Sequence, residues 1–351
     1  MILCSLNSCL LFLCVEEKKP NPITTIILHP PSRIESSFIT FAPMQNPVIC
    51  IGAALVDELL HAGNSMMLAT TNNAVATKTA GGVARNIAHQ LSIIDVPVQL
   101  ISVFGNDSDG DWLKQVCTKA GVQLDASITK EGLSGKYTGI LSVDGSLFSA
   151  FLTNSALHLI TPAHLEQHKN LLLTASYLLA DANINVDTVE WLLAFSIESG
   201  IPFVIEPVSV PPAKKLNGIN LKGLHLITPN EDELPVLCSE SATFVDKQIE
   251  ELMQKGVENV WLHNGKHGSI LNTKEHRLHL HAPSIEVVDC TGAGDGSLSG
   301  YLLGKHLGKD DVECLKLAHT LSAEILQVNG SIVTHRTQQE ILQLVSKYYP
   351  S

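Results

Sequence analysis

Residues 288–297 read VDCTGAGDGS, and a run with helical periodicity follows them. Glycines in such a turn allow the backbone to approach a ligand closely. The amides of Gly292, Ala293 and Gly294 fall at the N-terminus of the predicted helix, where the helix dipole is positive and unpaired N–H groups bind anions. The stretch therefore predicts an anion hole at the start of a helix.

Asp295 falls in the first turn of this predicted helix. A carboxylate beside those amides can accept the proton of an attacking hydroxyl, while the amides hold the charge that develops on a transferred phosphoryl group. A Gly-x-Gly-Asp sequence before a helix is also typical of a simple N-cap. The stretch alone leaves both interpretations open.

Before residue 288, apolar β-branched runs alternate with amphipathic segments of helical length. The predicted strands are 48–52, 99–104, 177–181, 203–206, 224–228 and 259–264. The predicted helices are 83–94, 109–120, 187–199 and 231–237. This alternation indicates an α/β fold in which helices cover both faces of a mostly parallel sheet. After residue 292, three apolar stripes predict a mostly helical tail.

Two stretches, 53–79 and 135–152, interrupt the alternation. Asp144 and Gly145 stand between two apolar runs, and an Asp-Gly pair in that setting is a strong hairpin signal. We expect parts of both stretches to form a small antiparallel lid beside the main sheet. Ordinary surface hairpins are the alternative.

The composition is that of a globular protein, with 45% hydrophobic and 17% charged residues among 351. A formal net charge of −12 argues against a nucleic-acid partner, because such proteins present basic surfaces. The eight cysteines fit neither a disulfide framework nor a Cys-x-x-Cys metal site, and reduced thiols in a cytosolic compartment are expected. A small polar ligand is therefore the expected partner.

Residues 1–43 differ from the rest of the chain in composition. Their apolar run is too short to span a bilayer and lacks a basic start, so it predicts neither a membrane partner nor a signal peptide. We interpret this segment as a disordered or non-native N-terminal arm. Residues 44–351 would then form one catalytic domain in the cytoplasm.

Two motifs resemble signatures of the ribokinase family, the PfkB-type carbohydrate kinases. Residues 289–295, DCTGAGD, resemble its C-terminal signature, and residues 81–86, GGVARN, resemble its Gly-Gly-x-x-x-Asn motif. The resemblance covers about residues 48–348. It implies a ribokinase-like fold with a β lid, and a kinase that uses ATP with Mg²⁺.

The resemblance also implies roles for residues in both motifs. Asp295 would be the general base, with Gly292, Ala293 and Gly294 as the anion hole. The residues expected to hold substrate hydroxyls are Asp57, Gly81, Gly82 and Asn86. A surface aspartate that ends a strand is the alternative interpretation of Asp57.

Three further segments resemble nucleotide and cation sites of the family. Asn230 and Glu233 match an Asn-x-x-Glu motif that would organise Mg²⁺ near the phosphates, although Asn230 could be only a helix cap. The expected nucleotide loop contains Asn264, Gly265 and Gly268. Asn-Gly is also the commonest hairpin turn. Asp289 and Thr291, with the 329–331 loop, resemble a monovalent-cation site, which makes K⁺ activation a hypothesis.

Resemblance to the pseudouridine kinase branch narrows the range of expected substrates. The residues that show this resemblance are 81–88, 180–184 and 206–209. Asn154-Ser155 departs from an Asp-Met pair found in that branch. The expected reaction is pseudouridine plus ATP giving pseudouridine 5′-phosphate and ADP. Kinases for ribose, adenosine or inosine, and a non-catalytic nucleoside-binding relative, are the alternatives. The resemblance also implies a homodimer, because lid strands in this family often pair between subunits.

Overall fold

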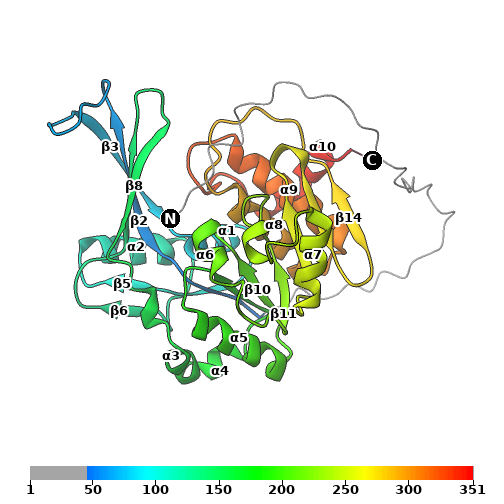
Figure 1. The fold of residues 1–351 in the computed structure, drawn as a ribbon. Coiled ribbons are helices and arrows are strands. Elements are labelled where there is room, and N and C mark those ends of the chain that lie inside the picture. Colours follow the sequence, from blue (N-terminus) through cyan, green and yellow to red (C-terminus); the bar gives the residue numbers. More distant parts are fainter. Residues whose placement is uncertain (1–45, 351) are drawn as a thin grey trace.

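The computed structural model describes residues 46–350, so the proposed arm at 1–43 lies outside the described part. An eight-stranded sheet forms its centre, in the order β14-β13-β12-β11-β10-β9-β1-β4 (Figure 1). The bounds are Val48–Ile51 (β1), Val98–Ile101 (β4), Tyr177–Asp181 (β9), Phe203–Glu206 (β10), Leu224–Ile227 (β11), Asn259–His263 (β12), Ser269–Asn272 (β13) and Arg277–Leu280 (β14). The strands from β4 to β12 run parallel, and β13 and β14 form an antiparallel edge.

Helices cover both faces of this sheet because its strands are apolar on both sides. In β1, for example, Ile49 and Ile51 belong to one core cluster, while Val48 and Cys50 belong to the other. The first cluster includes residues of α3 (Pro162–Gln167), α4 (Lys169–Leu172), α5 (Val186–Ser199), α6 (Val210–Lys214) and α7 (Val245–Gln254). The second includes residues of α1 (Val83–Ile93), α2 (Ser108–Lys119), α8 (Ala293–His306), α9 (Asp311–Leu326) and α10 (Gln338–Tyr348). The predicted α/β architecture is confirmed.

Two predicted elements were wrong. The strand expected at 99–104 is two strands, because the chain leaves the main sheet after β4 and β5 (Val103–Gly105) pairs with β6 (Ile128–Lys130). The helix expected at 231–237 is a single 3-10 turn, Pro235–Leu237. Asn230 caps this turn, since its Oδ1 accepts the amides of Asp232 and Glu233. The Leu234 amide makes one α-type bond to the carbonyl group of Asn230, but Pro235 has no N–H to donate to Glu231, so the helix does not continue.

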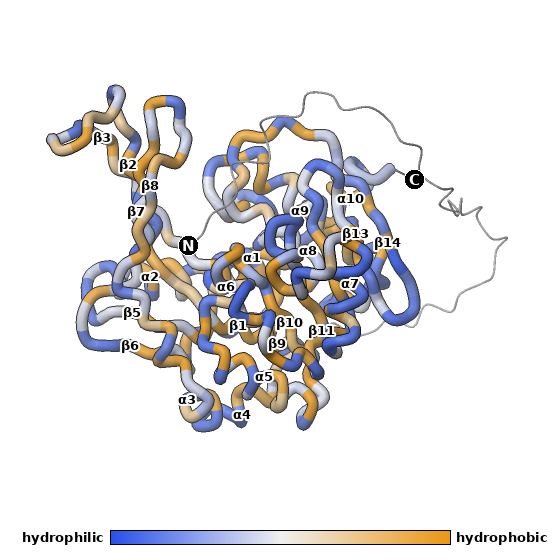
Figure 2. Tube along the Cα trace, in the orientation of Figure 1, coloured by the Kyte–Doolittle hydropathy of each residue, from blue (hydrophilic) through white to orange (hydrophobic). Residues whose placement is uncertain are grey.

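A second, four-stranded sheet has the order β3-β2-β7-β8. Its strands are Leu55–Ala62 (β2), Ala74–Gly81 (β3), Lys136–Leu141 (β7) and Leu147–Thr153 (β8). The hairpin predicted at Asp144-Gly145 is confirmed, since β7 and β8 pair antiparallel across that turn. The outer ends of the strands extend away from the main body (Figure 1), and apolar residues occur along them (Figure 2). We refer to these four strands as the outer sheet.

None of the helices between residues 46 and 350 combines the length and hydrophobicity that a membrane crossing requires.

Candidate active site

The two signature motifs meet in space. Asn86 lies in the first turn of α1 and Asp295 in the first turn of α8, and these two helices pack against each other. Asn86 Nδ2 donates a hydrogen bond of 2.7 Å to Asp295 Oδ2. The side chains are 209 residues apart in sequence, so the fold alone brings them together.

The N-terminus of α8 has the features of an anion site. Gly292 is its N-cap residue in the left-handed conformation, with φ 76°, and no side chain caps this helix end. A Cβ at Gly292 would lie 2.5 Å from Ser331 Cβ, whereas a Cβ at Gly294 would meet nothing within 4 Å. The loop is therefore packed on one side and open at Gly294, where a phosphoryl group can approach the backbone.

Asp295 is buried, with 8% of its surface exposed. Burial raises the pKa of its carboxyl group to about 7. The hydrogen bond from Asn86 and the attraction of Arg85 lower this pKa, but by less than burial raises it. A general base works best when its pKa is close to the working pH. The environment of Asp295 thus suits proton abstraction from an alcohol.

Asp57 lies in β2 beside Gly81, the last residue of the neighbouring strand β3. Its Oδ1 atom is buried without a hydrogen-bond partner, and burial raises the pKa of its carboxyl group to about 6. A Cβ at Gly81 would lie 2.1 Å from Asp57 Oδ2, and one at Gly82 (φ 98°) would lie 2.2 Å from the carbonyl oxygen of Ala53. Glycine is required at Gly82, where a Cβ would clash with backbone, whereas a Cβ at Gly81 would displace the Asp57 carboxylate. The unpartnered oxygen of Asp57 suits a ligand hydroxyl.

Two carboxylates at this edge, the buried Asp181 and the partly buried Glu206, were not predicted as site residues. Asp181 Oδ2 accepts the amides of Ala53 (2.7 Å) and Ala84 (3.1 Å), so it ties the end of β9 to the start of α1. Glu206 Oε2 accepts the hydroxyl of Thr228, and burial followed by repulsion from Glu233 raises the pKa of Glu206 well above its ordinary value. Each residue ends a predicted strand. Their place at the carboxyl end of a predicted strand could have identified both residues from sequence, because ligands bind outside the carboxyl ends of parallel strands.

Asn230 and Glu233 bind each other. The side-chain Nδ2 of Asn230 donates to Glu233 Oε1 (2.9 Å), and the backbone N–H of Asn230 donates to Glu233 Oε2 (3.0 Å). Burial raises the pKa of Glu233 to about 7. Glu206 and Glu233 are therefore two desolvated carboxyl groups that repel each other, and a hard cation with oxygen ligands, such as Mg²⁺, would relieve that repulsion.

The predicted nucleotide loop connects β12 to β13, so the segment is also a hairpin connection. Asn264 Oδ1 is buried without a partner, and Gly265 has φ 50°. Gly268 has φ 93°, and a Cβ there would lie 2.0 Å from the carbonyl oxygen of Leu280. The loop therefore packs closely against the end of β14.

Asp289 joins two loops near α8. Its Oδ1 accepts the amide of Thr291 (2.9 Å) and its Oδ2 accepts the amide of Gly330 (3.0 Å). These bonds bring together the segments expected to form a monovalent-cation site. Within residues 46–350, no group of three or more His, Cys, Asp or Glu side chains has the arrangement of a metal site.

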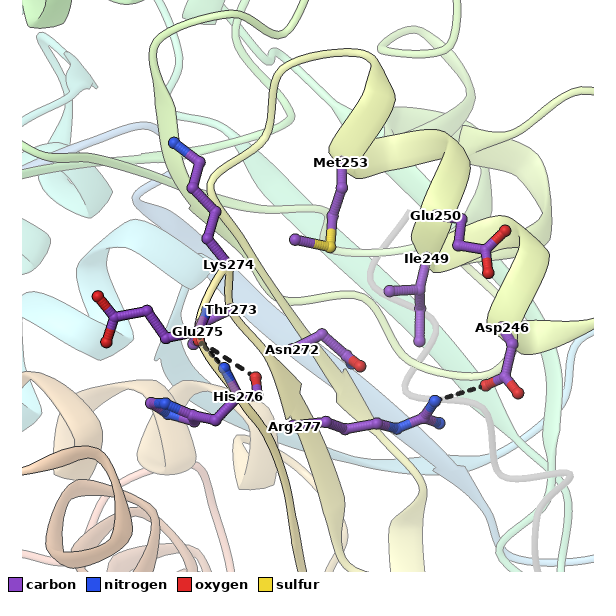
Figure 3. A pocket seen from close by; sticks show the side chains of 10 residues that line it. All are labelled: Asp246, Ile249, Glu250, Met253, Asn272, Thr273, Lys274, Glu275, His276 and Arg277. Atoms are coloured by element: carbon purple, nitrogen blue, oxygen red, sulfur yellow. Dashed lines mark hydrogen bonds and ion pairs between the residues drawn. The ribbon is translucent and has the colours of Figure 1, made fainter. Parts of the chain in front are cut away.

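Two cavities lie in different places. A small one between the outer sheet and the main sheet is lined by Ala53, Leu55, Tyr137, Leu152, Ser155, Leu157 and Asn183. A larger, open one lies between α7 and the turn that joins β13 to β14, where Arg277 Nη1 contacts Asp246 Oδ1 at 2.8 Å (Figure 3). It lies at the end of β13 opposite to the 264–268 loop, and no predicted site residue lines it. No predicted site residue lines the small cavity either, but its residues Leu55 and Asn183 lie two positions from Asp57 and Asp181, so it is the cavity beside the candidate active site.

Comparison with known proteins identifies a family model that matches most of this chain. The model of the pfkB family carbohydrate kinases matches residues 46–338. The uncharacterized sugar kinase YeiI of Escherichia coli is 31% identical over 229 residues, which is 64% of this chain and 62% of YeiI, less than two thirds of that relative. The pseudouridine kinase of Escherichia coli is 27% identical over 258 residues, 72% of this chain and 82% of that enzyme.

Solved structures show the same fold at low sequence identity. The ribokinase of Thermotoga maritima has a TM-score of 0.76 at 21% identity, with 86% of this chain and 99% of that chain covered. The Arabidopsis thaliana ribokinase complexed with ribose and ATP has a TM-score of 0.75 at 22% identity, with 86% and 98% covered. The predicted ribokinase-like fold is confirmed.

Proposed function

Because this chain belongs to the pfkB family of carbohydrate kinases, we propose that it transfers the γ-phosphoryl group of ATP to the 5′-hydroxyl of a ribose-type substrate. One observation carries this proposal: Asp295 is held 2.7 Å from Asn86 at a helix N-terminus that no side chain caps, in the part of the site where Asp57 has a buried, unpartnered oxygen. A base, an anion site and a hydroxyl acceptor are the groups that phosphoryl transfer to an alcohol requires.

In the proposed reaction, the carboxylate of Asp295 takes the proton of the substrate hydroxyl. The hydroxyl oxygen then bonds to the γ-phosphorus, the bond from that phosphorus to the β,γ-bridging oxygen breaks, and ADP leaves. The amides at the start of α8 stabilise the charge on the transferred group. Asp57, Gly81, Gly82 and Asn86 hold the sugar, and the outer sheet acts as a lid that excludes water.

ATP is assigned to the 264–268 loop, with Asn264, Gly265 and Gly268 giving room for its base and ribose. Asn230 and Glu233 would hold Mg²⁺, which supplies positive charge to the phosphates when it is bound. Asp289 and Thr291 are assigned to a K⁺ site. The acidic chain can receive an anionic nucleotide in this way, because ATP brings its own cation.

The substrate we favour is a nucleoside, with pseudouridine first. The small cavity, of about 20 Å³, holds no base in this structure, and the residues around it are what support this choice. Tyr137 pairs with Asp57 in the register of β2 and β7, and Ser155 and Asn183 add a hydroxyl and an amide that can bind the polar edge of a base. The identity to a pseudouridine kinase and the motifs at 81–88, 180–184 and 206–209 point the same way.

The cations of the outer sheet argue against a phosphorylated sugar as substrate. Lys78 and Lys136 are the lysines of its four strands, and no arginine occurs in them. Asp109 of α2 binds both, at 2.5 Å from Lys78 Nζ and 3.3 Å from Lys136 Nζ. A substrate phosphate would have to compete with that carboxylate.

The test is an ADP-release assay with the full chain on pseudouridine, uridine, adenosine, ribose and fructose 6-phosphate, with Asp295→Asn as the inactive control. We expect the highest kcat/KM on pseudouridine. Preference for another acceptor would refute the substrate and leave the kinase chemistry standing. Absence of acceptor-dependent ADP release from the whole panel would refute the kinase proposal.

A further inference from the structure

Arg85 is a buried cation beside the candidate active site. It lies in α1, directly before Asn86, and 1% of its surface is exposed. A guanidinium group without solvent must be satisfied by hydrogen bonds and opposite charge, since its desolvation is costly. Its contacts therefore show what it is placed to do.

The hydrogen bonds of Arg85 run to the backbone and to Asn86. Arg85 Nε donates to the carbonyl oxygen of Gly81 (3.2 Å), and Nη2 donates to the carbonyl oxygen of Ala80 and to Asn86 Oδ1. Nη1 lies 3.3 Å from His89 Nδ1, and burial, then Arg85, lowers the pKa of His89 to about 4, so this histidine adds no charge near neutral pH. One planar group thus joins the end of β3 to the side chain that touches Asp295.

These contacts fix which end of the Asn86 amide faces Asp295. Asn86 Oδ1 accepts from Arg85 Nη2 and from Ser331 Oγ (3.2 Å), which leaves Nδ2 to donate to Asp295 Oδ2. A flipped amide would place its NH₂ group against the guanidinium, which can only donate, and its oxygen against a carboxylate. Arg85 and Asp295 therefore each disfavour the flipped amide.

The charge of Arg85 also acts on both site carboxylates. Its attraction lowers the pKa of Asp57 and of Asp295, in opposition to the burial that raises both. Asp57 and Asp181 act in the opposite sense on Asp295. The groups that face Asp295 are Arg85 and Asn86 from α1, Asp57 from β2, Asp181 from β9 and Glu206 from β10. Arg85 is the cation among these acids.

We propose that Arg85 is a positioning residue for phosphoryl transfer: it orients the Asn86 amide toward Asp295 and supplies the positive charge that keeps Asp295 ionised. The inference rests on the proposed function in so far as Asp295 is the base. It assigns two separable tasks to one side chain, orientation through the planar fork and ionisation through the charge.

Two substitutions separate these tasks. Arg85→Lys keeps a positive charge, but an ammonium group cannot reproduce the planar fork that reaches Ala80, Gly81 and Asn86 together. Arg85→Gln keeps one donor for Asn86 and removes the charge. Arg85→Lys therefore loses the fork alone, Arg85→Gln loses both the fork and the charge, and the difference between the two variants reports the charge.

The first measurement needs no substrate, so it stands whether or not the proposed reaction is right. The full chain is labelled with ¹³Cγ-aspartate, the Asp295 signal is assigned through Asp295→Asn, and its titration is followed by NMR. We expect Arg85→Gln to move the Asp295 midpoint upward by about 1 pH unit, since a neighbouring opposite charge shifts a pKa by about 1–3 units. Arg85→Lys should leave the midpoint within a few tenths of a unit.

The second measurement is kinetic, on the best acceptor of the panel. Arg85→Lys should lower kcat about tenfold with the KM for ATP unchanged, because the amide of Asn86 loses its orientation while the nucleotide loop is untouched. A purely structural Arg85 would lower the melting temperature and leave both the Asp295 midpoint and the kcat of the folded protein as in wild type. That result, or failure of both variants to fold, would overturn the proposal.

Discussion

Replacement of Asp295 by Asn should stabilise the protein while it lowers turnover, and the gain in stability should depend on pH. Burial raises the pKa of this carboxyl group from 3.8 to about 7 in the folded protein. Between these two values the folded state holds a proton that the unfolded state has released, so the stability of the wild type falls as pH rises through this window. The loss of stability is absent below the pKa that Asp295 has in the unfolded protein, and it is complete above the pKa that it has in the folded protein.

The size of this stability gain depends on how much of the interval between the two pKa values is covered by the two pH values compared. Between pH 5 and pH 8, about two pKa units of the shift take effect, and at about 1.36 kcal/mol per unit this amounts to about 2–3 kcal/mol. Asparagine has no charge to bury and can still present an oxygen to Asn86 Nδ2. Relative to wild type, Asp295→Asn should therefore gain about 2–3 kcal/mol more at pH 8 than at pH 5.

Urea unfolding of both proteins at the two pH values measures this difference. The exposed carboxylate of Asp111, in the first turn of α2, offers Asp111→Asn as a control that removes the same charge without relieving burial. The turnover of Asp295→Asn should fall by roughly 10²–10⁴-fold, as loss of a general base usually causes. A stability difference that is equal at pH 5 and pH 8 would refute the burial of an ionisable base at this position.

Three further predictions concern the rest of the site. The kcat/KM of the wild type should lose about a factor of ten per pH unit below about pH 7, because only ionised Asp295 accepts the proton, and a flat profile from pH 5.5 to 8 would contradict this. Gly81→Ala should raise the acceptor KM at least tenfold, since its Cβ would lie 2.1 Å from Asp57 Oδ2. Gly63→Ala, where the nearest atom to a Cβ lies at 3.8 Å, should not, and equal effects would exclude the steric argument. Glu233→Gln should raise the Mg²⁺ concentration needed for half-maximal rate about 10–100-fold, and an unchanged Mg²⁺ titration would remove Glu233 from the metal site.

The sequence allowed the fold to be predicted where local pattern and tertiary environment agree. The predicted bounds of β9 and β10 match the structure, because short apolar runs between turns have few other ways to be buried. The helix predicted at 231–237 was wrong because Pro235 lacks the N–H that would continue the turn begun at Asn230. The apolar pattern of the segment does not report that missing donor.

The motifs identified the residues of the candidate site better than they identified the interactions among them. Asn86 and Asp295 could be named from sequence, but their hydrogen bond spans 209 residues. Arg85 stands in the same motif, yet nothing in the sequence distinguishes a buried guanidinium from an exposed one. The raised pKa values of Asp57 and Asp295 likewise arise from burial, which only the packed structure determines.

The way in which the outer sheet joins the body has a consequence for how this protein can change. Asp57 and Gly81 lie where β2 and β3 meet the main body, whereas the far ends of these strands, joined by residues 63–73, lie well away from it (Figure 1). Asp295 belongs to α8, which is packed against α1 and α9. The acceptor contacts proposed for Asp57 and Gly81 and the chemical step proposed for Asp295 thus belong to different segments, and residues 63–73, at the far end of the outer sheet, are free to vary without change to either.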